Sequence, residues 1–167
     1  MPNIDLPLTD SIETLIYRVI TTKLSNDPVL TRVVRTMHLY LGSRSDSEPV
    51  GDVNSLPYLL VYPGPNPSDT ATERHSESTM IVTFEIGING TNASDLLNLW
   101  SAIRVCLFPG DGSMKALMDS TRSDRNEAWV TLQLGQPIYA AQQLPDGSQM
   151  LSGTGAAKVT IWQSTAL

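Results

Sequence analysis

Residues 79–89 read TMIVTFEIGIN, and this stretch decides the fold class. Every second residue in it is large and apolar: Met80, Val82, Phe84, Ile86 and Ile88. Strict alternation places one row of side chains on one face of a β-strand, here against a core. Ile81 belongs to the other row, which indicates that the second face of this strand is also partly covered.

Five more segments have strand character. Residues 56–62, LPYLLVY, form the unbroken apolar run of a buried strand, and PGPNP over 63–67 ends it. The remaining strands are expected over residues 37–41, 128–134, 137–144 and 157–162. PDGS at 145–148 is a turn signal between two of these strands, and Gly153-Thr154-Gly155 predicts a break before the last one.

The N-terminal part of the chain predicts two helices. Asp10 with Glu13 has the spacing of a capping box. An apolar stripe follows at Ile12, Leu15, Ile16, Val19 and Ile20, with Thr14, Arg18 and Thr21 on the opposite side. Asp27 is expected to cap a second helix, with Pro28 at its first position. The apolar face of this second helix is predicted to contain Val29, Leu30, Val33 and Val34.

A third helix is predicted after the long strand, capped by Asn92 or Ser94 and ended by Pro109-Gly110. Its apolar stripe is predicted at Leu96, Leu97, Trp100, Ile103 and Leu107. A short helical turn is expected around residues 114–118. Strands in runs separated by few helices indicate an α+β fold, a mostly antiparallel β-sheet with helices packed on one face.

Residues 1–167 are interpreted as a single domain with two polar loops, at about 42–55 and 63–78. Such loops are long for a compact domain, and long loops are usually functional or disordered. In a protein that assembles, they can become ordered against a neighbour.

Composition limits the possible partners. The chain is 41% hydrophobic and 17% charged, which argues against disorder, and its formal net charge is −6. Without a Lys/Arg run, a stable grip on nucleic acid phosphates is not expected, although a wall that DNA slides past is compatible with this charge. The neutral polar surface suits burial against a partner, and equally suits a plain solvated surface.

The N-terminus lacks the pattern of a signal peptide, and no apolar run reaches the ~18 residues of a membrane span. We therefore expect a soluble protein in a reducing compartment, without membrane contact. The two glycosylation sequons, at residues 89–91 and 92–94, are interpreted as turn and helix-cap residues. Cys106, the single cysteine, lies in an apolar run and is expected to be a buried small hydrophobe.

The sequence offers little for catalysis. His38 and His75 are the only histidines, and each has an ordinary interpretation in a strand or loop. Metal-binding spacings and phosphate-binding glycine loops are not found, so no metal or cofactor is expected. Asp46, Glu48 and Asp52 share one loop, where a solvated acidic segment is favoured over an acid–base pair.

Five segments carry a resemblance to a known family. They are DSIETLIYRVI (10–20), DPVL (27–30), LPYLLVYPG (56–64), MIVTFEIGING (80–90) and SDLLNLWSAIRVCLF (94–108). In their order and spacing, from about Asp10 to Trp162, the chain resembles the tail terminator and tail-completion (neck) proteins of long-tailed bacteriophages. The 42–55 loop and the extended C-terminal hairpin depart from the family pattern.

The resemblance implies a virion protein assembled in the host cytoplasm, without catalytic residues. It would form a homo-oligomeric ring, typically a hexamer, at the head-proximal end of the tail tube. The ring would end tube polymerisation and join the tail to the head–tail connector, with DNA passing transiently through the lumen. Our hypothesis is that some of five acidic residues face the lumen or a neighbouring subunit: Asp46, Glu48, Asp52, Asp69 and Glu73.

Three alternatives stay open from the sequence. The first is another neck component, such as a head-completion or stopper protein, or a tail tube subunit. The second, from a different class, is a small α+β enzyme or ligand-binding domain, which would need a concave pocket with converging polar groups. A bacterial adaptor domain is the third.

Overall fold

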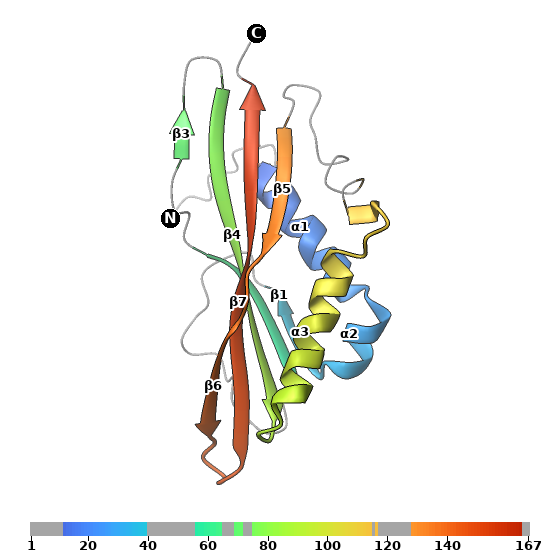
Figure 1. Ribbon diagram of the computed structural model, residues 1–167, viewed down its shortest axis with the longest axis vertical. Coiled ribbons are helices and arrows are strands. Elements are labelled where there is room, and N and C mark those ends of the chain that lie inside the picture. Colours follow the sequence, from blue (N-terminus) through green and yellow to red (C-terminus); the bar gives the residue numbers. More distant parts are fainter. Residues whose placement is uncertain are drawn as a thin grey trace, which may run out of the picture.

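The computed structural model of the protein describes residues 12–39, 56–64, 69–71, 75–114, 116 and 128–164. The predicted α+β class is confirmed, with helices on one face of a mostly antiparallel sheet (Figure 1). The elements follow one another as α1 (Ile12–Ser25), α2 (Pro28–Val33), β1 (Thr36–Leu39), β2 (Tyr58–Pro63), β3 (Asp69–Ala71), β4 (His75–Asn89), α3 (Ala93–Leu107), β5 (Ala128–Leu134), β6 (Ile138–Gln143) and β7 (Gln149–Ser164).

The described strands form one seven-stranded sheet in the order β1-β2-β4-β7-β5, with β3 on β4 and β6 on β7. Only β1 and β2 pair in parallel. β4 and β7 pair over their whole length and run from one end of the sheet to the other (Figure 1). β5 pairs with the second half of β7 and β6 with the first half, so two strands share one side of β7.

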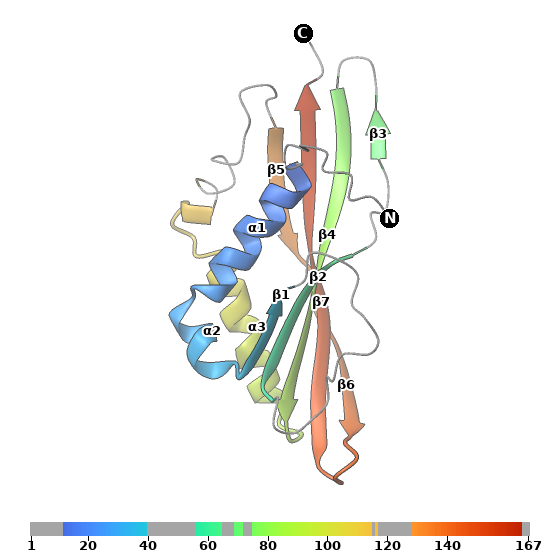
Figure 2. The ribbon, with the colours of Figure 1, turned by 180° about the vertical axis from the view of Figure 1, so that it is seen from behind.

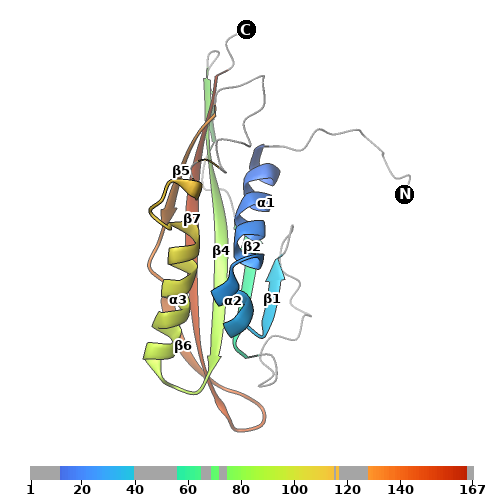
Figure 3. The same cartoon turned by 90° about the vertical axis from the view of Figure 1, so that its right-hand side faces the viewer.

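The main core lies between this sheet and the helices. Val82, Phe84 and Ile86 of β4 are fully buried, as the alternation of residues 79–89 predicts. The rings of Phe84 and Trp100 meet edge to face, with centroids 6.2 Å apart and planes at 71°. Figure 3 shows α1 and α3 side by side in front of the sheet. Each large apolar side chain buried here contributes on the order of 1.5–3 kcal/mol, so this layer holds the helices on the sheet.

Helix α1 buries the predicted Ile16 and Ile20, and one turn further on it buries Leu24. The expectation that Thr21 faces outward is wrong, because this residue is only 8% exposed. It lies one turn after buried Tyr17, and its hydroxyl donates to the Tyr17 carbonyl at 3.0 Å, so its burial leaves no unpaired hydroxyl. Asp10 lies outside the described residues.

Asp27 caps α2 as predicted, because its carboxylate accepts from the backbone N–H groups of Val29 and Leu30, both at 2.9 Å. The predicted apolar face is wrong at two positions. Val29 and Val33 are 44% and 46% exposed, and only Leu30 and Val34 are buried. The buried pair forms one i, i+4 row of α2, and the adjacent row of Val29 and Val33 is left exposed.

Asn92 caps α3, since its side chain accepts from the N–H of Ser94 at 3.1 Å. Leu97 was predicted in the buried stripe, but it is 51% exposed. Leu99 and Cys106 are buried in addition to the other predicted positions, because they lie three or four residues from those positions along the helix. Ser113, Met114 and Ala116 that follow are helical, and the Ala116 N–H donates to the Gly112 carbonyl at 3.0 Å.

The predicted break at residues 153–155 is wrong, because β7 runs without interruption from Gln149 to Ser164. Both glycines are covered by aromatic rings. Tyr139 lies over Gly153, where an added Cβ would be 3.1 Å from the ring, and Trp100 lies over Gly155. Glycine in a strand often marks such a close approach, and a sequence pattern alone cannot separate that role from a break.

The predicted 63–78 loop is only partly a loop, because 69–71 form β3 and β4 begins at His75. β3 pairs with residues 76–78 of β4. Backbone hydrogen bonds stabilise this polar ribbon without an apolar pattern, so periodicity could not reveal it. The predicted 42–55 loop lies outside the described residues.

A second, smaller cluster lies on the other face of the sheet. It contains Leu56, Tyr58, Leu60, Leu144 and Met150. Leu144 and Met150 come from the two sides of the β6–β7 hairpin, so this cluster joins the hairpin to β2. The partial cover that Ile81 indicated for the second face is present, since Ile81 itself is half-buried near Gly64 and this cluster covers the same face further along the sheet.

Candidate interaction surfaces

The five acidic residues singled out from the sequence are not brought together in the described part of the chain. Asp69 is the first residue of β3, where it is paired with Ser78 at the end of the sheet remote from the β6–β7 hairpin (Figure 1). Asp46, Glu48, Asp52 and Glu73 lie outside the described residues. Their role at a lumen or a subunit contact stays a prediction.

The candidate nucleophile is Cys106, and the candidate bases are His38 and His75. Cys106 is 4% exposed and donates to the Lys23 carbonyl at 3.4 Å. Burial, together with the negative charge and hydrogen bond of Asp27, raises the pKa of this thiol to about 12. The thiol is therefore neutral at physiological pH, when a nucleophile would be a thiolate. His38 is exposed on β1, and His75 is the first residue of β4.

Among the described residues, no group of three or more His, Cys, Asp or Glu side chains could hold a metal ion. Over the same residues, no helix is long and apolar enough to cross a membrane. What the described surface offers instead is exposed apolar area, in two separate places.

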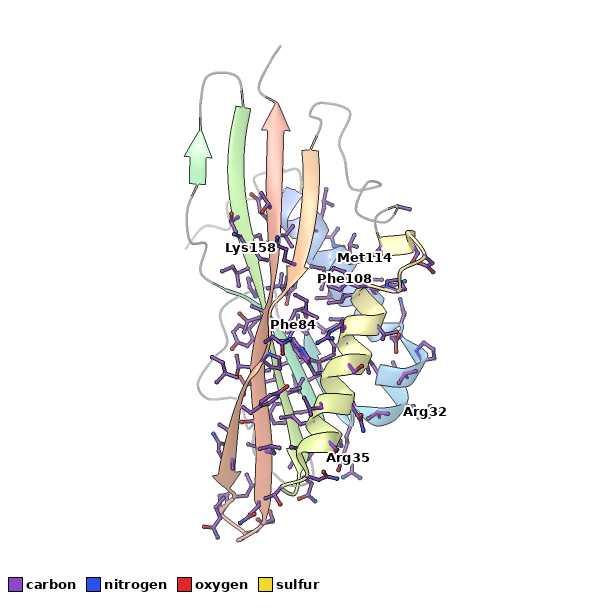
Figure 4. The ribbon with its side chains drawn as sticks, in the orientation of Figure 1. Arg32, Arg35, Phe84, Phe108, Met114 and Lys158 are labelled. Atoms are coloured by element: carbon purple, nitrogen blue, oxygen red, sulfur yellow. The ribbon has the colours of Figure 1, made fainter. Side chains whose placement is uncertain are left out.

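The first place is the helix layer. Val29 and Val33 of α2 line a groove of about 400 Å³ together with Leu99 and Ala102 of α3 and Ile88 of β4. Asn89, Asn98 and Asp95 supply the polar part of its wall. Leu97 and Val105 add exposed apolar side chains on α3. Arg32 belongs to α2 and Arg35 follows it, and both lie in the helix layer on the α2 side of the molecule (Figure 4).

The second place is strand β6, all six residues of which are exposed. Ile138 is 80% exposed and Tyr139 is 41% exposed. β6 lies at the edge of the sheet, apart from α2 and its groove (Figures 1 and 2). The sequence contains one signal for this surface, which is the absence of charge and not a periodicity. Residues 128–145 contain no charged side chain.

The sheet face opposite the helices is mostly neutral and polar along β4 and β7. Paired positions there include Glu85 with Thr154 and Thr83 with Ala156, all exposed or half-buried. Lys158 lies on this face, away from the helices (Figure 4). Such a face can contact water, protein or passing nucleic acid without strong attraction to any of them.

Comparison with known proteins gives distant likeness to solved structures alone. No protein family model matches the chain, and no curated protein matches it. One solved structure with a similar chain is titled "Virion of native gene transfer agent (GTA) particle". The TM-score is 0.43 at 10% sequence identity, over 91% of this chain and 99% of that chain. Likeness at this level does not transfer a role.

Proposed function

We propose that this protein is a structural virion component that forms a ring at the head-proximal end of a phage tail tube. The ring ends tube polymerisation and joins the tail to the head–tail connector, and DNA passes through its lumen. The whole chain acts as one tail-terminator-like domain, and six copies make the ring. The activity is assembly, without a catalytic step.

The observation that supports this proposal most is the presence of two unlike apolar surfaces at separate places on the molecule. One is strand β6, with Ile138 exposed, and the other is the α2–α3 groove that Val29 and Val33 line. A cyclic ring needs a heterologous interface, in which one patch meets a different patch of the next copy. The exposed β6 strand can supply one patch of such an interface, and the separate groove leaves an apolar surface for a different contact.

The order of elements supports it as well. The segments that resemble tail terminators form α1, α2, β2, β4 and α3, and together these make a sheet with helices on one face. This is the architecture that the resemblance implies. The long β4–β7 pair gives the domain an elongated shape suited to a wall element (Figure 1).

The charge of the chain fits a conduit for DNA. A net charge of −6 disfavours phosphate binding, and the residues proposed for the lumen or a subunit contact are all acidic: Asp46, Glu48, Asp52, Asp69 and Glu73. Hydrogen–deuterium exchange on monomer and ring tests their placement. Protection of 42–55 or 63–78 upon assembly is expected for a subunit contact, and equal exchange in both states contradicts that contact.

A capping experiment tests the function itself. Purified protein is added to polymerising tail tube protein from the same phage, and tube lengths are measured by electron microscopy. We expect substoichiometric protein to stop elongation and to appear as one extra disc at one tube end. Incorporation along the whole tube would show a tube subunit instead, and unchanged growth without end binding would contradict the proposal.

A further inference from the structure

Strand β6 is an edge strand without the usual protection. Natural edge strands avoid pairing with other chains through charged side chains, prolines or bulges. β6 reads IYAAQQ, with no charge and no proline, and every one of its residues is exposed. In an antiparallel pair about half of the N–H and C=O groups of an edge strand point away from its partner. An uncharged edge of this kind fits an added β-strand.

Strand β1 is the other edge of the same part of the sheet. In the described residues it pairs with β2 alone. Paired residues line up across the sheet from one edge strand to the other. In β1, β2, β4, β7 and β6 one such row consists of Met37, Leu59, Ile86, Gly153 and Tyr139. Like β6, β1 contains no Asp, Glu, Lys or Arg.

Strand direction decides how two copies could join. β1 and β2 run parallel, and each later step, to β4, β7 and β6, is antiparallel. β6 therefore runs opposite to β1 within one copy. When copies are related by rotation about an axis along the strands, every copy keeps its direction. β6 of one copy then meets β1 of the next as an antiparallel pair, the better hydrogen-bonded kind.

We propose that β6 of one copy adds to the β1 edge of a second copy, so that the sheets of neighbouring subunits become continuous around the ring. The inference rests on the proposed ring and names the contact that closes it. The β6–β1 contact is heterologous, because two different strands meet in it. Repetition of this contact around an axis gives a closed assembly.

Side chains on both faces suit this pairing. Tyr139 of β6 and Met37 of β1 lie on the helix face, where Met37 already packs against the main core. An edge-to-edge junction would place apolar side chains of the two copies together on that face. On the other face the junction would bring Ile138 and Ala140 near Thr36 and His38, without any Lys or acidic side chain.

Disulfide trapping tests the junction. Cysteine is introduced at Thr36 or His38 of β1 together with Ile138, Ala140 or Gln142 of β6, all on the face away from the helices. Cross-strand Cα atoms at about 4.5–5.5 Å fit a disulfide. Within one copy the two edges are four strand spacings apart, about 19 Å, so no intrachain disulfide can form. We expect at least one of the six double variants to give a ladder of cross-linked subunits on oxidation.

Two controls set the background. The parent chain contains only buried Cys106 and should give no ladder. Thr36→Cys combined with Thr22→Cys places the second thiol on the exposed side of α1 instead of β6, and it should also give none. Assembled rings without a ladder in all six variants would overturn the inference. A dimer from Ala140→Cys alone would overturn it too, since that result indicates a two-fold β6–β6 contact.

A charge on β6 gives an independent test. Ile138→Lys should weaken self-association at least tenfold in sedimentation experiments, whereas Thr22→Lys, at an exposed position on α1 outside both surfaces, should leave it unchanged. Equal effects would contradict the assigned junction. A parent chain that forms no oligomer at any concentration would contradict both the proposed ring and the β6–β1 junction. A ring that forms through other contacts would contradict the junction alone.

Discussion

The indole of Trp100 lies directly over Gly155, so closely that a Cβ at position 155 would overlap the ring. The contact joins α3 to the middle of β7 at the point where Trp100 and Phe84 also meet edge to face. It accounts for a glycine at position 155 within an unbroken strand.

Gly155→Ala is therefore expected to lower the free energy of unfolding by about 1–3 kcal/mol, because the new methyl group forces the indole or the strand to shift. Urea unfolding followed by Trp fluorescence measures it. Gly135→Ala is the matched control, since a Cβ there would meet only the Ala156 carbonyl, at 3.5 Å. If both variants unfold at the same urea concentration, the Trp100 contact is not what requires glycine.

Tyr17→Phe should cost about 1 kcal/mol, because the Tyr17 hydroxyl donates to the Val61 carbonyl at 2.8 Å in a buried place. This bond joins α1 to β2. Tyr139→Phe removes a hydroxyl from a side chain that is 41% exposed, and it should leave thermal unfolding nearly unchanged. A larger loss in Tyr139→Phe than in Tyr17→Phe would contradict the described packing of α1.

Asp27→Ala should destabilise the protein by about 1 kcal/mol, since two backbone N–H groups at the start of α2 lose their acceptor. Asp27→Asn retains an acceptor oxygen and should preserve most of this stability. Chemical denaturation of the three proteins at pH 7 measures the difference. Equal losses in both variants would show that the carboxylate charge, and not the cap geometry, is responsible.

Stability should fall as the pH rises above about 9. The unfolded Cys106 thiol loses its proton near its ordinary pKa of 9.0, whereas the folded thiol keeps it up to about 12. The unfolded state then binds fewer protons than the folded state, so this group lowers the unfolding free energy by up to about 1.4 kcal/mol per pH unit in that window. Burial also raises the pKa of Tyr17, which extends the decline above pH 10.

The Cys106→Ala variant isolates the thiol contribution. Its unfolding free energy should be lower at pH 7 because a buried side chain is truncated, but it should decline less steeply between pH 9 and 10. Parallel curves for the two proteins would contradict the assigned shift. In the folded parent at pH 8, an alkylating reagent should react with Cys106 much more slowly than in urea.

The fold class could be predicted from the sequence because strong periodicity marks its main elements. The alternation of residues 79–89, the apolar run of β2 and the Asp27 and Asn92 caps are local signals, and each is present in the structure. The order of these elements was enough to infer a sheet with helices on one face.

Two of the errors share one physical cause, because tertiary contacts determine the structure of segments whose local pattern is ambiguous. The rings of Trp100 and Tyr139 make Gly153 and Gly155 compatible with an unbroken strand. Thr21 is a different case, because a hydrogen bond within its own helix allows its hydroxyl to be buried. Pairing with β4 turns the polar segment 69–71 into a strand.

The candidate surfaces were harder to predict than the core. Acidic loops can be identified from residue type alone, whereas the exposure of β6 depends on its place at the edge of the sheet. The absence of charge in residues 128–145 is the one sequence signal for this surface. It predicts an interaction surface only once the fold shows that β6 is an edge strand.

The central claim is that copies of this chain close into a ring. Native mass spectrometry of the purified chain over a wide concentration range, with negative-stain images of the same sample, tests it most directly. The account predicts one discrete oligomer of about six subunits, annular in the images, whose subunit number does not grow with concentration. A monomer at every concentration, or a filament that lengthens without limit, would contradict it.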